Sequence, residues 1–113
     1  MDGESPVVTI TTQIAGAVHY EGAQTKLNRL RDGTEVELVR VLDNPHDLNA
    51  IACYKDGQML GYIKMRDNRQ AAAAMDRGET VRCAIHGFQP MVRLTWASMD
   101  LAEATRLRGI ARA

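Results

Sequence analysis

Residues 50–63 set the fold of this chain, and they read Ala50-Ile51-Ala52-Cys53-Tyr54-Lys55-Asp56-Gly57-Gln58-Met59-Leu60-Gly61-Tyr62-Ile63. Two apolar segments, 50–54 and 59–63, flank the dipeptide Asp56-Gly57. An Asp-Gly pair favours a two-residue turn whose twist matches that of paired strands, and β-branched and aromatic residues suit a pleated, half-buried surface. This segment therefore predicts an antiparallel hairpin.

Four further segments have the composition or the alternation of strands. They are residues 7–14, 35–41, 81–88 and 91–96. We expect the first strand to continue past Gly16 to Tyr20 through a bend, and Gln89-Pro90 to separate the last two strands. Short strands joined by hairpins predict a mostly β protein with two helices, folded as a small OB-like antiparallel β-barrel.

The main helical signal follows the hairpin. Residues 67–77 contain four alanines and end before a glycine, which is typical of a helix that stops at that glycine. A short polar stretch at 22–30 predicts one or two helical turns. Asp100 stands three residues before Glu103, and this capping pattern predicts a terminal helix over about 101–108.

Length and composition fit one small domain. The chain has 113 residues, of which 45% are hydrophobic and 25% are charged, values that are ordinary for a globular protein. We expect a flexible tail over 1–6 and the barrel over 7–97. Residues 98–113 are expected to form a helix that packs on the barrel against Trp96.

Charge and cysteine content bound the possible partners and the compartment. The formal net charge is zero, so nucleic-acid binding would have to rest on a local patch. There is no signal-peptide pattern and no stretch long enough to span a bilayer. Cys53 and Cys83 have no close cysteine neighbour and are expected to be buried and reduced. These features predict a cytoplasmic protein, associated with the nucleoid if it binds DNA.

The loop before the hairpin carries more polar groups than a turn requires. It reads Asp43-Asn44-Pro45-His46-Asp47-Leu48-Asn49. Asn and Asp side chains bond their own backbone in tight turns, and Pro45 fixes one φ angle. Turn chemistry gives no reason for an imidazole, however. We therefore interpret His46 and Asp47 as the rim of a site that bonds a hydroxyl, a base edge or a phosphate.

This loop, together with Gly61-Tyr62-Ile63, resembles the HIRAN domain. The similarity begins at Ala15-Gly16-Ala17-Val18-His19-Tyr20 and covers roughly residues 8–88. HIRAN domains occur at the N-termini of SNF2-type ATPases and as bacterial domains that stand alone or are fused differently. The resemblance implies an OB-like barrel that captures single-stranded DNA at a free 3′ end, in DNA repair or replication-fork processing. It also implies a helicase or nuclease partner, acting in trans or fused to the domain.

The resemblance assigns a DNA-binding pocket residue by residue. The pocket would comprise Gly16, His19, Tyr20, Asn44, His46, Asp47, Tyr62, Lys64 and Arg66. In this family picture Asp47 accepts a hydrogen bond from the terminal 3′ hydroxyl, while His19 and His46 occupy the positions that sandwich bases. Two residues depart from the pattern, because Val18 and Met65 stand where basic residues would grip phosphate. Lys64 and Arg66 are the available substitutes.

Two other classes of function are weighed against DNA binding. Zero net charge, Val18 and Met65 favour a protein-interaction or regulatory module on the same barrel, whereas the intact loop opposes it. Catalysis or metal binding would require His19, His46 or His86 to act with Asp47. Their spacing matches no ligand motif, so we expect no enzyme, no metal and no cofactor. The chain is expected to be a monomer.

Overall fold

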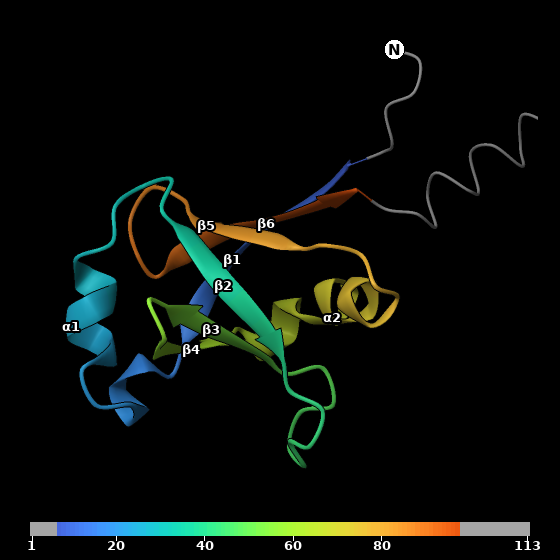
Figure 1. Cartoon of the computed structure of the whole chain (residues 1–113), viewed down its shortest axis with the longest axis horizontal. Helices are drawn as coiled ribbons and strands as arrows, with labels where there is room; N and C mark the ends of the chain where they lie inside the picture. Colours follow the sequence, from blue (N-terminus) through green and yellow to red (C-terminus); the bar gives the residue numbers. More distant parts are fainter. Residues whose placement is uncertain (1–6, 98–113) are drawn as a thin grey trace, which may run out of the picture.

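The structure is a computed structural model, and it describes residues 7–97. The elements are β1 (Val7–Ala15), η1 (Ala17–His19), α1 (Ala23–Asn28), β2 (Glu35–Arg40), β3 (Ile51–Lys55), β4 (Gln58–Ile63), η2 (Met65–Asp67), α2 (Arg69–Asp76), β5 (Arg82–Ile85) and β6 (Met91–Ala97). The strands form a closed barrel in the order β1-β4-β3-β2-β5-β6 (Figure 1). Every neighbouring pair is antiparallel. The predicted mostly β barrel with two helices is confirmed.

The two helices of this part of the chain are α1, at the predicted short helical stretch, and α2, at the alanine run. The tail over 1–6 and the terminal helix over 101–108 lie outside the described residues. Trp96 is buried and belongs to the barrel core.

Several element boundaries differ from the predictions, and three of the differences have a clear physical reason. β1 ends at Ala15 and does not continue to Tyr20, because Gly16 adopts a left-handed φ of 83° and the chain turns into η1. α2 starts two residues late, since residues 65–67 form a 3-10 turn. β5 stops at Ile85 because the His86 N–H donates to the Met91 carbonyl and closes the turn to β6.

The hairpin of β3 and β4 forms as predicted, with Asp56 and Gly57 both at positive φ. Position 61 in this hairpin accepts only glycine. Its φ is 141°, and a Cβ there would overlap the carbonyl oxygen of Ala15. Glycine therefore allows β1 to approach β4 and sets Ala15 opposite Tyr62.

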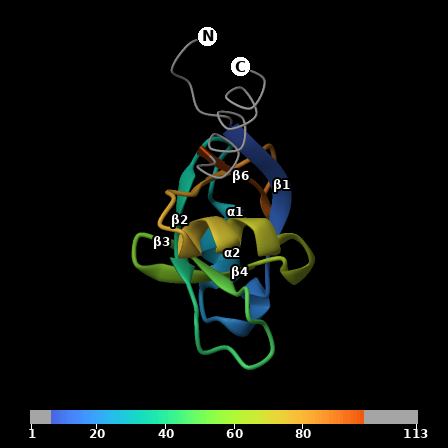
Figure 2. The same ribbon diagram turned by 90° about the vertical axis from the view of Figure 1, so that its right-hand side faces the viewer.

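The helices are fixed to the barrel by buried apolar side chains. Leu27 of α1 is 1% exposed, and Ala71, Ala72 and Ala74 of α2 are fully buried in the same core. Burying a leucine side chain contributes roughly 1.5–3 kcal/mol, and small alanine side chains let α2 lie close to the strands. In Figure 2, α2 crosses in front of the strands.

Both ribbon views place η1 and the loop of residues 43–49 at the same end of the barrel (Figures 1 and 2). The start of β1 and the end of β6 lie at the opposite end. None of the helices within residues 7–97 is long and apolar enough to cross a membrane.

Candidate functional site

Tyr20 and Tyr62 form an aromatic pair where β1 meets β4. The strand register brings Tyr62 opposite Ala15, and η1 then turns the chain back, with the Tyr20 N–H donating to the Ala17 carbonyl at 3.1 Å. The two ring centroids are 6.3 Å apart and the ring planes are inclined by 50°. A hydrogen bond with Tyr20, partial burial and the nearby Asp43 carboxylate raise the pKa of Tyr62.

The loop is held internally by its own side chains. The Asn44 Oδ1 accepts a hydrogen bond from the His46 N–H at 2.9 Å, and the Asp47 Oδ1 accepts one from the Asn49 N–H at 2.9 Å. Each bond spans two residues, the pattern of an Asx turn. Turn chemistry therefore accounts for the side-chain oxygen of Asn44 and for one carboxylate oxygen of Asp47. The His46 side chain remains exposed.

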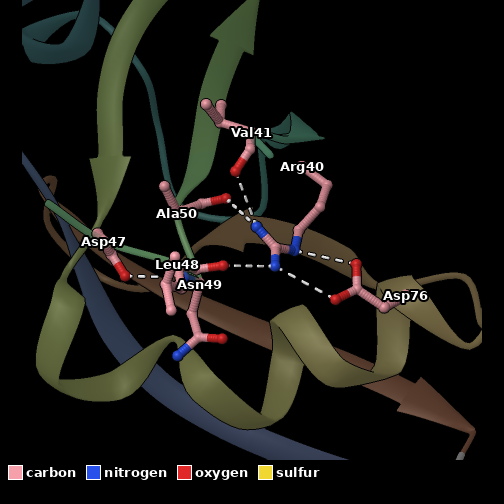
Figure 3. A network of polar contacts seen from close by, with 7 residues as sticks. All are labelled: Arg40, Val41, Asp47, Leu48, Asn49, Ala50 and Asp76. Atoms are coloured by element: carbon pink, nitrogen blue, oxygen red, sulfur yellow. Dashed lines mark hydrogen bonds and ion pairs between the residues drawn. The ribbon is translucent and has the colours of Figure 1, made fainter. Parts of the chain in front are cut away.

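Arg40 ties this loop to the barrel and to α2 (Figure 3). Its Nη1 donates to the carbonyls of Val41 and Ala50 at 2.9 and 3.0 Å, and its Nη2 donates to the Leu48 carbonyl at 2.7 Å. The same guanidinium pairs with the Asp76 carboxylate, with 3.1 Å between Nε and Oδ1. The Arg40 side chain is only 13% exposed. One cation therefore fixes both ends of the loop against the last turn of α2.

Asn68 holds the second oxygen of Asp47. Its Nδ2 donates to the Asp47 Oδ2 at 2.9 Å, and its side chain is fully buried where α2 begins. The Asn68 side chain caps no helix amide, and its Oδ1 has no hydrogen-bond partner within residues 7–97. Each Asp47 oxygen thus accepts one protein hydrogen bond and retains a further lone pair. Asp47 as a whole is half-buried, so its carboxylate combines fixed orientation with hydrogen-bonding capacity beyond these two contacts.

The other predicted residues border these contacts. His19 is exposed, and its Cδ2 would lie 3.7 Å from a Cβ placed on Gly16. Lys64 is half-buried and its N–H donates to the Gln13 carbonyl, which continues the pairing of β4 with β1. Arg66 is 73% exposed and lies 3.8 Å from the Asp67 carboxylate. Within residues 7–97, no hydrogen bond or ion pair joins the side chain of His46 or Arg66 to another predicted site residue.

Comparison with known proteins identifies the family. The HIRAN domain family matches residues 7–96. The chain belongs to this family. HIRAN domains are generally DNA-binding modules and are not catalytic on their own. No curated protein matches the chain.

Two solved structures share the HIRAN fold seen here. The crystal structure of the HIRAN domain of human HLTF is 20% identical in sequence, and the match covers 92% of this chain and 88% of that one, with a TM-score of 0.68. A protein from Lactobacillus plantarum is 26% identical, and the match covers 81% of this chain and 95% of that one, with a TM-score of 0.68. The first likeness, below 25% identity, bears on the fold alone.

Sequence reasoning missed two residues that shape this face of the HIRAN domain. Arg40 ends an alternating strand, and such a position is typical of an exposed charge. Asn68 directly precedes α2, which is the position of a helix cap. Its actual partner, Asp47, is 21 residues away in the chain. No local pattern signals that bond.

Proposed function

We propose that this HIRAN domain captures single-stranded DNA at a free 3′ end, in DNA repair or replication-fork processing. The observation that carries the proposal is the orientation of Asp47. Its carboxylate is held by the Asn49 N–H and the Asn68 side chain, in a loop fastened by Arg40, and keeps accepting capacity on a half-buried surface. A rigid, partly desolvated carboxylate suits the recognition of one hydroxyl group.

The neighbouring side chains suit the rest of a terminal nucleotide. His19, Tyr20, His46 and Tyr62 present rings at this end of the barrel, and stacking on an aromatic ring is worth roughly 1–3 kcal/mol per base. Asn44 lies next to the terminus and helps to fix it. Lys64 and Arg66 follow β4 and meet the phosphates of the strand. Gly16, with its left-handed φ of 83°, turns the chain into η1 and so positions His19.

The same carboxylate gives the site its preference among DNA ends. A 3′ hydroxyl donates a hydrogen bond to Asp47, whereas a 3′ phosphate brings a second negative charge against it. A closed hairpin offers neither a free terminus nor unpaired terminal bases. We therefore expect binding to fall in the order 3′ hydroxyl, 3′ phosphate, closed hairpin.

Binding of short oligonucleotides with these three ends, measured by fluorescence anisotropy at stated low and moderate salt, tests the proposal. Asp47→Asn is expected to weaken binding of the 3′-hydroxyl strand about tenfold or more, because a hydrogen bond to a charged group is worth roughly 1.5–3 kcal/mol. The affinities for the 3′-hydroxyl and the 3′-phosphate strands should also differ less in this variant than in the parent protein.

Glu35→Gln is the matched control. It removes one carboxylate charge from β2, where Glu35 pairs with Arg82 at the surface, and should leave both affinities unchanged. Equal binding of all three ends by the parent protein, or an Asp47→Asn variant that binds the 3′ hydroxyl as the parent does, contradicts the proposal.

Docking of a partner protein on the same barrel is the second candidate function. The exposed apolar side chains of Val18 and Met65 favour it, at 78% and 63% exposure. If no oligonucleotide binds even at low salt, this second function replaces the first. Under the DNA-binding proposal, a helicase or nuclease acts in trans or is fused to the domain, and the protein resides in the cytoplasm or on the nucleoid.

A further inference from the structure

One edge of β1 has a neighbouring strand only near its end. β6 pairs with β1 from Val7 to Gln13. On the other side, β4 pairs with β1 at Ile14 and Ala15, and the Lys64 N–H adds one bond to the Gln13 carbonyl. Among the residues that the structure describes, the earlier part of β1 therefore has a partner strand on one side only.

The backbone register shows which groups this edge leaves open. In an antiparallel ladder, alternate residues direct both backbone groups to the same neighbour. Ile14 bonds on the β6 side, since its N–H donates to the Pro90 carbonyl, and residues 8, 10 and 12 follow it. Thr9 and Thr11 direct their N–H and C=O groups the other way, as Gln13 does. Within residues 7–97, no backbone or side-chain group bonds these four groups of Thr9 and Thr11.

A groove lies between β1 and the start of α2. In Figure 2, β1 stands on the side of α2 where η2 leads into that helix. The Thr12 hydroxyl donates to the Asp67 Oδ2 at 2.8 Å and so holds η2 against β1. The groove has a volume of about 300 Å³, and its lining residues are Ile10, Arg66, Asp67, Arg69 and Gln70.

Two exposed arginines give this groove a positive charge. The Arg66 side chain is 73% exposed, and its Nε lies 3.8 Å from the Asp67 Oδ1. Arg69 is exposed as well, and no carboxylate of residues 7–97 pairs with it. The groove therefore carries two guanidinium groups against one carboxylate, and that carboxylate already accepts the Thr12 hydroxyl.

We propose that the free edge of β1 binds an extended acidic segment of a partner protein, which adds a strand to the sheet. A polypeptide backbone repeats its donors and acceptors every two residues, about 7 Å, which is the spacing between Thr9 and Thr11. Acidic side chains of the segment pair with Arg66 and Arg69. A second copy of this chain fits less well, because pairing two β1 edges brings two positive grooves together.

Nuclear magnetic resonance of the full chain tests this docking site. The probe is a synthetic (Glu-Val)₄ peptide with blocked ends, and (Lys-Val)₄ is its matched control. In the free protein, the Thr9 and Thr11 amides should exchange with solvent as quickly as unbonded amides do. The acidic peptide should shift both amide signals and slow their exchange, whereas the basic peptide should do neither.

Two pairs of variants separate the backbone contacts from the ionic ones. Thr11→Pro removes one edge donor, which a strand tolerates where that N–H faces solvent, and should weaken peptide binding about fivefold or more. Thr11→Val keeps the backbone and should bind as the parent does. Arg69→Gln should weaken binding about two- to fivefold. Arg29→Gln removes an exposed guanidinium at the end of α1 and should have no effect.

The inference is overturned if about 1 mM acidic peptide leaves the Thr9 and Thr11 amides unchanged, or if Thr11→Pro and Arg69→Gln both bind as the parent does. Slow exchange of these amides in the free protein also overturns it. The edge is then covered by a second copy if protection rises with protein concentration, and by the chain itself if it does not.

Nucleic acid is the remaining alternative occupant, because Arg66 also belongs to the proposed DNA site. If a single-stranded oligonucleotide shifts the Thr9 and Thr11 amides and the acidic peptide does not, the groove binds nucleic acid and the inference is wrong. The inference does not rest on capture of a 3′ end. Equal binding of the three DNA ends refutes that function and leaves the peptide result standing, so the two proposals can fail separately.

Discussion

Asp47 owes its position to donors that lie on two different parts of the chain. The Asn49 N–H belongs to its own loop, whereas the Asn68 amide stands at the start of α2 and is fully buried. A buried amide with one free acceptor atom costs free energy, roughly 1–3 kcal/mol for an unsatisfied group. Within residues 7–97, Asn68 thus orients the Asp47 carboxylate through its Nδ2 while its own Oδ1 stays without a partner.

A second carboxylate beside Asp47 should make the stability depend on pH. In Asn68→Asp, two like charges stand at hydrogen-bond distance, which raises the pKa of one of them above its unfolded value of about 4. A raised pKa in the folded state means that stability is retained below about pH 4 and lost as pH rises through the folded pKa. We expect this variant to be less stable than Asn68→Ala at pH 7 by about 1–3 kcal/mol, and the gap to close toward pH 4. Urea unfolding at both pH values measures the gap, and a gap of equal size at both contradicts the contact.

The 43–49 loop behaves as an element of its own because Arg40 replaces the strand pairing that it lacks. After β2 ends, one guanidinium donates to the carbonyls of Val41, Leu48 and Ala50 and also pairs with Asp76. The Ala50 carbonyl accepts the Val41 N–H as well. A loop fastened in this way loses little conformational entropy when a ligand binds. The rigidity of the candidate site therefore depends on Arg40, whose guanidinium is engaged by acceptors of the protein itself.

Replacing this arginine should destabilise the fold more than replacing an exposed one. Arg40→Met is expected to lower the free energy of unfolding by about 2 kcal/mol, because carbonyl groups and a half-exposed carboxylate lose their charged donor. Arg82→Met is the control, since its pair with Glu35 is exposed on both sides and worth at most about 0.5–1 kcal/mol. Urea unfolding compares the two, and hydrogen exchange at the loop amides should accelerate only in the first. If the two variants are destabilised equally, the contacts of Arg40 contribute no more to stability than a surface ion pair does.

The barrel as a whole encloses its two cysteines. Cys53 on β3 and Cys83 on β5 are both paired with β2, both are reduced, and both are buried, as predicted from their apolar neighbours. Burial raises the pKa of Cys83 to about 12, and burial together with the proximity of Cys83 raises that of Cys53 well above its ordinary value. Both thiols are therefore neutral and unreactive while the barrel is closed.

Thiol reactivity should consequently report on unfolding of the entire barrel. At pH 8, a disulfide reagent such as dithionitrobenzoate should label neither cysteine of the native protein rapidly, and both in guanidinium chloride. Because the folded pKa values lie above the unfolded value of about 8.5, the stability they contribute is intact below that pH and is lost as pH rises toward about 12. Melting temperatures measured from pH 8 to pH 11 should therefore fall. Rapid labelling of native protein at pH 8 would show that the barrel opens locally.

Local patterns in the amino-acid chain were enough to predict the six strands, the Asp56-Gly57 turn and the alanine-rich helix, because each depends on neighbours within a few residues. The family resemblance assigned Tyr20, Tyr62 and Asp47 to one pocket; the structure pairs the two tyrosines, and the inclusion of Asp47 stays a prediction. Only the tertiary structure shows how β1 closes the barrel and how the chain turns at Gly16. It also shows the contacts of Arg40 and Asn68 that hold the 43–49 loop. Those features depend on which residues distant in sequence come to face one another, as Asn68 faces Asp47, and no local periodicity encodes that encounter.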